Sequence, residues 1–193
     1  RSLERWVNGP MSWRPVTDIH SVPINAMSRR NAAEIIKRCW QRQTPVTGVA
    51  ARHLNGYMLD LSGVVIGDLP YLPGDFSHVT AINLSRTYMS QQSVSALVTK
   101  CPALCWLNAE NNFLSVVPAG IRNLRQLTRL TLANNRIVLT GDMVQTFRRL
   151  PSLRLLNLER NPIGPLLDVS GMPQLLNLFL RATGIQDAPS GVF

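Results

Sequence analysis

The sequence is poor in acidic residues, cysteine and long apolar runs, and each shortage narrows the class of protein. There are 11 Asp+Glu against 20 Lys+Arg among 193 residues, a formal net charge of +9 at pH 7, which favours acidic partners. Three cysteines are an odd number, which argues against a disulfide framework and favours a reducing compartment. No run of about 18 apolar residues occurs, and the first residues lack the apolar core of a signal peptide. We therefore expect neither a membrane-spanning helix nor a signal peptide.

Catalytic motifs are also missing. The chain has no glycine-rich phosphate loop, His-Glu-x-x-His helix or Gly-x-Ser-x-Gly elbow. Cys101 and Cys105 lack the second pair of Cys or His ligands that a zinc site needs, although a disulfide between them stays open. We expect no metal, no cofactor and no catalytic residue, so this chain alone is not predicted to be an enzyme.

Basic charge gathers near the N-terminus, where residues 28–52 are predicted to form a helical cap. Residues 1–52 hold nine Lys+Arg against three Asp+Glu. Ser28 is expected to cap a helix running from about Arg29 to Gln43. Its apolar stripe comprises Ala32, Ala33, Ile35, Ile36, Cys39 and Trp40. We interpret it as a cap on the repeats, preceded by an irregular lead-in over residues 1–27 that is rich in proline. Docking of its basic side on nucleic acid or an anionic membrane is the alternative.

A repeating pattern occupies residues 53–193. Apolar residues at positions 1, 4, 6 and 11, with a special residue at position 9, recur six times, and the clearest copies begin at Leu104, Leu127 and Leu153. Position 9 is occupied by Val64, Thr87, Asn112, Asn135, Asn161 and Thr183. This is the leucine-rich repeat pattern, which predicts an α/β solenoid: an arc of about six parallel strands with an irregular or short helical convex side. Short helices are expected within 90–100 and 141–150, and an irregular return within 164–172.

The period of two along a strand assigns the faces of the predicted sheet. Positions 4 and 6 point inward, and positions 3, 5 and 7 point to a concave, solvent-facing side. Asn112, Asn135 and Asn161 are predicted to form a structural ladder, because an amide side chain can satisfy backbone groups of adjacent coils. Thr87 and Thr183 can supply part of that bonding.

The concave side carries large apolar and basic residues where the pattern predicts solvent, and Trp and Arg are frequent in interface hot spots. The candidate protein-binding residues are Trp106, Asn108, Glu110, Arg129, Thr131, Leu155, Asn157, Glu159, Arg160, Phe179 and Arg181. The alternative is that some of these side chains pack on each other or beneath further chain. The last repeat stops midway on its convex side, so we expect a fragment of a longer protein, truncated at its C-terminal end.

Three segments carry a family resemblance: Arg-Arg-Asn-Ala-Ala-Glu-Ile-Ile-Lys-Arg-Cys-Trp (29–40), Leu-Leu-Asn-Leu-Glu-Arg-Asn-Pro-Ile (155–163) and Asp-Val-Ser-Gly-Met-Pro-Gln-Leu (168–175). The chain resembles the repeat region of bacterial leucine-rich effectors of the invasion-plasmid-antigen type, which end in a novel ubiquitin ligase domain. The resemblance implies secretion into a host cell, recognition of host proteins as substrates, and restraint of an intramolecular ligase domain that uses a Cys-x-Asp nucleophile.

No catalytic residue follows from the resemblance. Cys39, Cys101 and Cys105 are followed by Trp-Gln, Pro-Ala and Trp-Leu, and none of these matches Cys-x-Asp. The ligase activity would therefore belong to a part of the parent chain outside this sequence. The alternative function is a stand-alone scaffold or adhesion module without enzymatic activity.

Overall fold

The computed structural model describes residues 2–9, 24–47 and 54–192. Each repeat contributes one short strand, and the sheet order in this part of the chain equals the chain order. The strands are β1 (Tyr57–Asp60), β2 (Val79–Asn83), β3 (Trp106–Asn108), β4 (Arg129–Thr131), β5 (Leu155–Asn157) and β6 (Asn177–Phe179). All five pairings are parallel. The predicted open sheet of six parallel strands in an α/β solenoid arrangement is confirmed.

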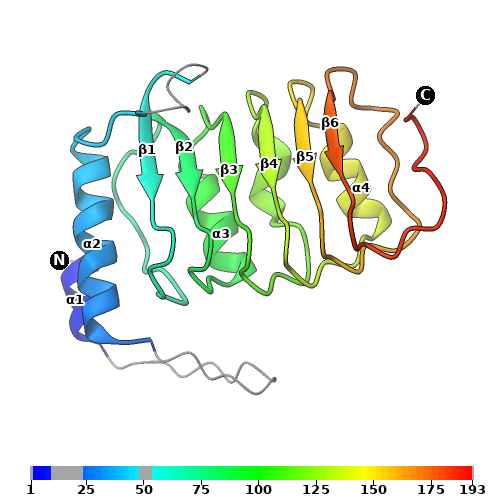
Figure 1. Cartoon of the computed structure of the whole chain (residues 1–193). Helices are drawn as coiled ribbons and strands as arrows, with labels where there is room; N and C mark the ends of the chain where they lie inside the picture. The colour runs from blue at the N-terminus through cyan, green and yellow to red at the C-terminus, as the bar shows by residue number, and fades with distance from the viewer. Residues whose placement is uncertain (1, 10–23, 48–53, 193) are drawn as a thin grey trace.

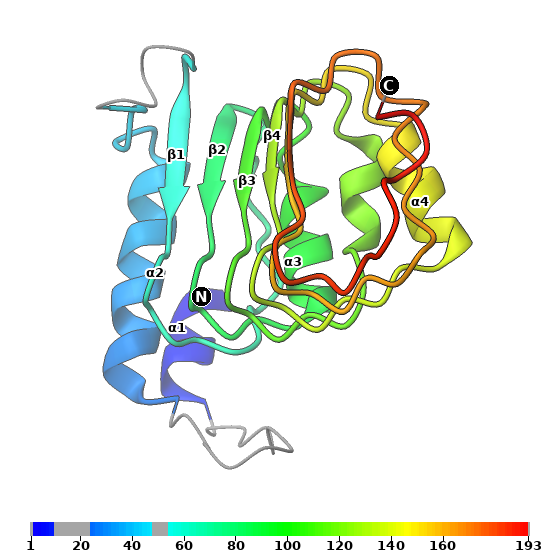
Figure 2. The same cartoon turned by 45° about the vertical axis from the view of Figure 1, so that its right-hand side comes forward.

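Helical segments form the wall opposite the sheet (Figures 1 and 2). They are α3 (Gln91–Val98), the 3-10 helix η2 (Ala119–Asn123) and α4 (Gly141–Arg148). The helices expected within 90–100 and 141–150 are thus confirmed, and residues 164–172 form no helix. No feature of the sequence pattern predicted η2. It packs closely on α3, since a Cβ at Gly120 would lie 2.6 Å from the Ser95 carbonyl oxygen.

The interior between these walls is filled by the apolar positions of the repeat. Position 4 supplies Leu59, Ile82, Leu107, Leu130 and Leu156, all fully buried in one continuous core. Its counterpart in the last coil, Leu178, is only partly buried, because no further coil of the described chain covers it. A leucine at this position is therefore shielded by its neighbours on both sides and not by its own coil.

Asparagines at position 9 tie consecutive coils together from inside. Asn135 Nδ2 donates to the carbonyl of Ala109 in the preceding coil (3.0 Å), and its Oδ1 accepts the backbone N–H groups of Asn112 (3.0 Å) and Leu114 (2.9 Å). Asn112 makes the matching three bonds one coil earlier. One coil later, Asn161 makes two of them: its Nδ2 donates to the Leu132 carbonyl, and its Oδ1 accepts the Ile137 N–H. These contacts satisfy buried backbone groups that would otherwise lack partners.

Two helices close the N-terminal end, and here three expectations were wrong. Ser2–Asn8 form helix α1 instead of an irregular lead-in; residues 10–23 of that lead-in lie outside the described residues. Helix α2 spans Ala26–Trp40 and is capped by Asn25, whose Oδ1 accepts the Ser28 N–H at 2.7 Å. Ser28 therefore lies in the first turn, because an asparagine three residues earlier takes the capping role. Trp40 ends the helix and is 50% exposed instead of lying on the buried stripe.

Arg29 explains why α1 forms within the proline-rich lead-in, which was predicted to be irregular. Its side chain is buried, donates to the carbonyl oxygens of Trp6 (3.1 Å) and Gly9 (3.3 Å), and lies over the Trp6 ring at 5.6 Å. A cation at the carbonyl end of a helix is favourable. Arg29 in the first turn of α2 therefore turns inward and holds α1.

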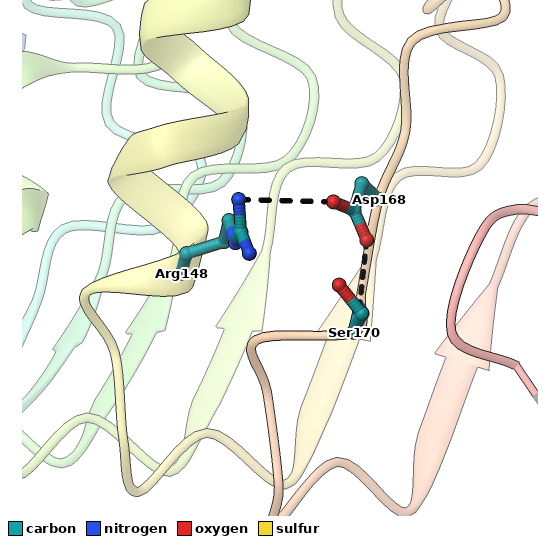
Figure 3. Close-up of polar contacts among 3 residues, drawn as sticks. All are labelled: Arg148, Asp168 and Ser170. Carbon is teal, nitrogen blue, oxygen red and sulfur yellow. Dashed lines mark hydrogen bonds and ion pairs between the residues drawn. The ribbon is translucent and has the colours of Figure 1, made fainter.

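On the convex side, a polar contact links α4 to the return that leads into the last coil (Figure 3). Arg148 Nη1 lies 3.9 Å from Asp168 Oδ2, and Asp168 Oδ1 accepts the backbone N–H of Ser170 at 2.9 Å. Hydrogen bonds from Ser170, together with the Arg148 guanidinium, lower the pKa of Asp168. Val169 next to it donates its N–H to the Ser190 carbonyl at 2.8 Å, which extends the link to the end of the described chain.

Candidate protein-binding surface

The outward positions of the strands form two side-chain rows across the sheet. Position 3 contributes Met58, Ala81, Trp106, Arg129, Leu155 and Asn177; position 5 contributes Asp60, Asn83, Asn108, Thr131, Asn157 and Phe179. Neighbours within a row lie about 4.8 Å apart, the spacing of adjacent strands. In Figure 1 the strands face the viewer, and none of the labelled helices lies in front of them. We call this side the open face.

Trp106 is half-buried because a second, small apolar cluster lies at the N-terminal part of the open face. This cluster contains Val46, Leu54 and Ala81, and Trp106 packs against it together with Met58. The chain after α2 is held there as Met58 donates its N–H to the Thr44 carbonyl at 2.8 Å. One alternative was that some of the candidate side chains pack on neighbouring side chains, and Trp106 in part does so.

Arg129 lies in register between Trp106 and Leu155, so a cation occupies the centre of an apolar row. All three side chains are half-buried. Within the described chain, no carboxylate lies within ion-pair distance of Arg129. Large apolar groups beside an unneutralised arginine are the composition found at interface hot spots.

Position 5 carries a second set of amides with a local role that the sequence analysis did not foresee. The Oδ1 atoms of Asn83, Asn108 and Asn157 accept the backbone N–H two residues later, at 3.2, 3.0 and 2.9 Å. Asp60 makes the same bond to Ser62 at 3.0 Å. The oxygen of each asparagine thus closes the end of its own strand, and the Nδ2 groups of Asn83 and Asn108 remain as donors without a partner among the described residues.

The two glutamates at position 7 are engaged by amides. Glu110 accepts from Asn111 Nδ2 at 2.9 Å and from Asn134 Nδ2 at 3.3 Å. Glu159 lies 3.5 Å from Asn157 Nδ2. The acidic groups among the candidates therefore have partners within the surface.

The bend after each strand places Arg160 at the end of the open face instead of on its rows. Every repeat has a left-handed residue at position 8: Gly63, Arg86, Asn111, Asn134, Arg160 and Ala182, with φ between +51° and +72°. Each of the first five donates its N–H to the following coil, for example Asn134 to the Glu159 carbonyl at 2.9 Å. The asparagines and the glycine at position 8 indicate a left-handed bend in the sequence itself, since these residues tolerate this conformation best.

Beyond these bends lies an aromatic rim that the sequence analysis missed. Tyr88 and Phe113 both have positive φ (+56° and +58°), and their ring centroids are 5.3 Å apart. The Arg136 guanidinium lies 4.8 Å from the Phe113 centroid. The last coil adds Phe179, which is 42% exposed, and exposed Arg181. The candidates therefore gather on one side of the molecule, with Phe179 and Arg181 at its open end.

The cysteines are free thiols in environments that disfavour the thiolate. Burial, with smaller contributions from nearby Cys39 and Asp75, raises the pKa of Cys101 to about 12. Burial also raises the pKa of Cys39 and of half-exposed Cys105. The described residues contain no group of His, Cys, Asp and Glu side chains suited to a metal ion, and no helix long and apolar enough to cross a bilayer.

Comparison with known proteins finds partial similarity. No family model matches the chain. It is 34% identical over 96 residues to a probable glycoprotein hormone G-protein coupled receptor of Anthopleura elegantissima, which covers 47% of this chain and 10% of the receptor. It is 30% identical over 92 residues to tubulin-specific chaperone E of Xenopus laevis, which covers 48% of this chain and 17% of the chaperone. The chain thus matches only a small part of either relative, and neither match points to the invasion-plasmid-antigen family.

Proposed function

We propose that this chain is a leucine-rich-repeat domain that binds another protein on the open face of its sheet. The observation that carries this proposal is the row Trp106, Arg129 and Leu155 on the open face, which none of the labelled helices covers. The 9-position asparagines satisfy the backbone between the coils, so stacking of the coils does not require these outward side chains. The partial matches to the receptor and the chaperone agree with a leucine-rich-repeat segment and a protein-binding role.

A binding role also suits the chemistry better than a catalytic one. The three thiols have raised pKa values, whereas a nucleophilic cysteine needs a lowered one. We therefore assign no catalytic residue to this chain and expect its partner to be recognised, not transformed.

Substrate selection for a bacterial ubiquitin ligase is the more specific form of the proposal. Its support is the resemblance of residues 29–40, 155–163 and 168–175 to the invasion-plasmid-antigen effectors. Secretion into a host cell, a host protein as target and contact with an intramolecular ligase domain belong to the same proposal. Sequencing the parent gene beyond Phe193 tests it: a following helical domain with Cys-x-Asp supports it, and a parent chain without one contradicts it.

Binding on the open face is tested by substitutions there and on the opposite wall. Arg129→Glu and Trp106→Ala are expected to weaken partner binding by about 2 kcal/mol or more each, about 30-fold in Kd, as hot-spot residues do. Arg149→Glu, an exposed residue that follows α4, makes the same charge reversal on the helical wall and is expected to leave binding unchanged. Affinity is measured by calorimetry with partners captured by the wild-type chain, after circular dichroism shows that each variant is folded.

Equal affinity of the wild type and the three variants for the partner would contradict binding on the open face. Loss of binding in Arg149→Glu alone would move the site to the helical wall.

A further inference from the structure

We propose that the open face binds an extended acidic peptide segment, with one of its carboxylates at Arg129 between Trp106 and Leu155. This inference rests on the proposed function and names the chemistry of the partner. It follows from which polar groups on this face are already engaged and which are left for a ligand.

The acceptors at the centre of the open face are used within the protein. The Oδ1 atoms of Asn83, Asn108 and Asn157 accept backbone N–H groups of their own strand ends. Glu110 accepts two amide N–H groups. A ligand approaching the sheet therefore meets few acceptors that lack a donor.

The donors, in contrast, are free. Among the described residues, the Nδ2 groups of Asn83 and Asn108, the Thr131 hydroxyl and the Arg129 guanidinium have no hydrogen-bond partner in the protein, and none of them is fully buried. Asn108, Arg129 and Thr131 lie on adjacent strands. Such a group of donors selects a ligand rich in acceptors, and a carboxylate can accept from several of them at once.

The apolar neighbours favour a peptide over a nucleic acid. Trp106 and Leu155 flank Arg129 on either side in the same row, and contact with them requires an apolar surface next to the acidic group. A phosphate backbone would be matched by several cations in succession, whereas position 3 offers one arginine between two apolar residues. An acidic residue with apolar neighbours in the peptide satisfies both requirements.

The size of the donor group fits a short extended segment. From Asn83 through Asn108 to Thr131 the row crosses three strands, about 10 Å at the usual strand spacing. An extended chain covers that distance in about three residues, since it rises about 3.3 Å per residue.

The experiment is selection of a random twelve-residue peptide library on the immobilised full chain. We expect peptides enriched in Asp or Glu next to apolar residues. For a selected peptide, replacing its acidic residue by the matching amide (Asp by Asn, Glu by Gln) is expected to weaken binding to the wild type at least 10-fold. The Arg129→Glu variant is expected to bind the acidic peptides weakly and to show no difference in affinity between a peptide and its amide form. The Arg149→Glu variant is expected to keep both the binding and the difference.

The outcomes separate this inference from the proposed function. Peptides that depend on Trp106 and Leu155 but show no preference for acid would overturn the acidic partner and leave binding on the open face intact. Peptides insensitive to every substitution on this face, or a library from which nothing is retained, would overturn both. A dT12 oligonucleotide that binds as tightly as the peptides and is lost with Arg129→Glu would replace the peptide by nucleic acid and overturn the inference.

Discussion

The middle coils and the last coil have the same sequence pattern but different burial. Leu107, Leu130 and Leu156 are fully buried, whereas Leu178 at the same position is only partly covered. In the last coil, Leu176 is 75% exposed and Phe179 42% exposed. In a solenoid each coil contacts only its neighbours, so a coil with one neighbour keeps its conformation but is shielded from one side only. The position of a coil in the stack therefore decides how much the same repeat pattern contributes to the stability of the protein.

Position 9 shows the same difference in hydrogen bonding. Asn135 bonds to its own coil and to the preceding one. Thr183 in the last coil donates its hydroxyl to the Leu180 carbonyl of its own coil at 2.7 Å. A middle-coil asparagine thus joins two coils, whereas Thr183 closes one bend.

The largest expected effect comes from breaking the middle ladder. Asn135→Ala leaves the N–H groups of Asn112 and Leu114 buried without their acceptor, and each such group costs about 1–3 kcal/mol. We expect the free energy of unfolding in urea to fall by about 3–5 kcal/mol. Thr183→Ala removes one hydrogen bond and is expected to cost about 1 kcal/mol.

Asn123→Ala serves as the control, because Asn123 is exposed at the end of η2 and is expected to change the free energy of unfolding by less than about 0.5 kcal/mol. Equal losses for Asn135→Ala and Thr183→Ala would show that the ladder does not join the coils.

A smaller effect is expected at the left-handed bends. Ala182 in the last coil has φ +57°, where the first coil has Gly63 at φ +72°. A left-handed conformation strains alanine but not glycine. Ala182→Gly is therefore expected to stabilise the protein, and Gly63→Ala to destabilise it, each by about 0.5–1 kcal/mol in urea unfolding.

The Gly63→Ala change isolates the backbone contribution, since a Cβ there would meet no atom within 4 Å. A destabilised Ala182→Gly variant would contradict the prediction that the backbone at Ala182 is strained. It would show that the larger conformational entropy of glycine in the unfolded state dominates at this bend.

The repeat could be predicted from the sequence because its signals are local and recur. Apolar residues at positions 4 and 6 recur in six copies, three of which have asparagine at position 9, and this pattern predicts the parallel strands and the buried wall. Features that depend on one contact between distant segments could not be read in the same way. Arg29 holding α1, and Val46 and Leu54 packing beside Trp106, leave no periodic trace.

The candidate site was predictable to a similar extent. The alternation of side chains places Trp106, Arg129 and Leu155 in one outward row. The alternation does not reveal that Asn108 and Asn157 use their oxygens locally, because a hydrogen bond to the backbone two residues later depends on the bend after the strand. That bend is set by the left-handed residue at position 8, which in two repeats is an arginine and in one an alanine.

The smallest expected effect concerns the contact that joins α4 to the last coil on the convex side. The pKa of Asp168 is lowered in the folded chain by Ser170 and Arg148, so its ionised form favours folding. This stabilisation is present above the unfolded carboxyl pKa of about 3.9 and is lost as pH falls through the lower folded value. We expect the urea midpoint of the wild type to exceed that of Asp168→Asn at pH 6 and the two to converge as the pH falls below 4. Added salt is expected to narrow the gap at pH 6 only in part, since salt screens Arg148 more than the hydrogen bonds from Ser170. A gap that persists unchanged at low pH would mean that Asp168 acts through packing and not through its charge.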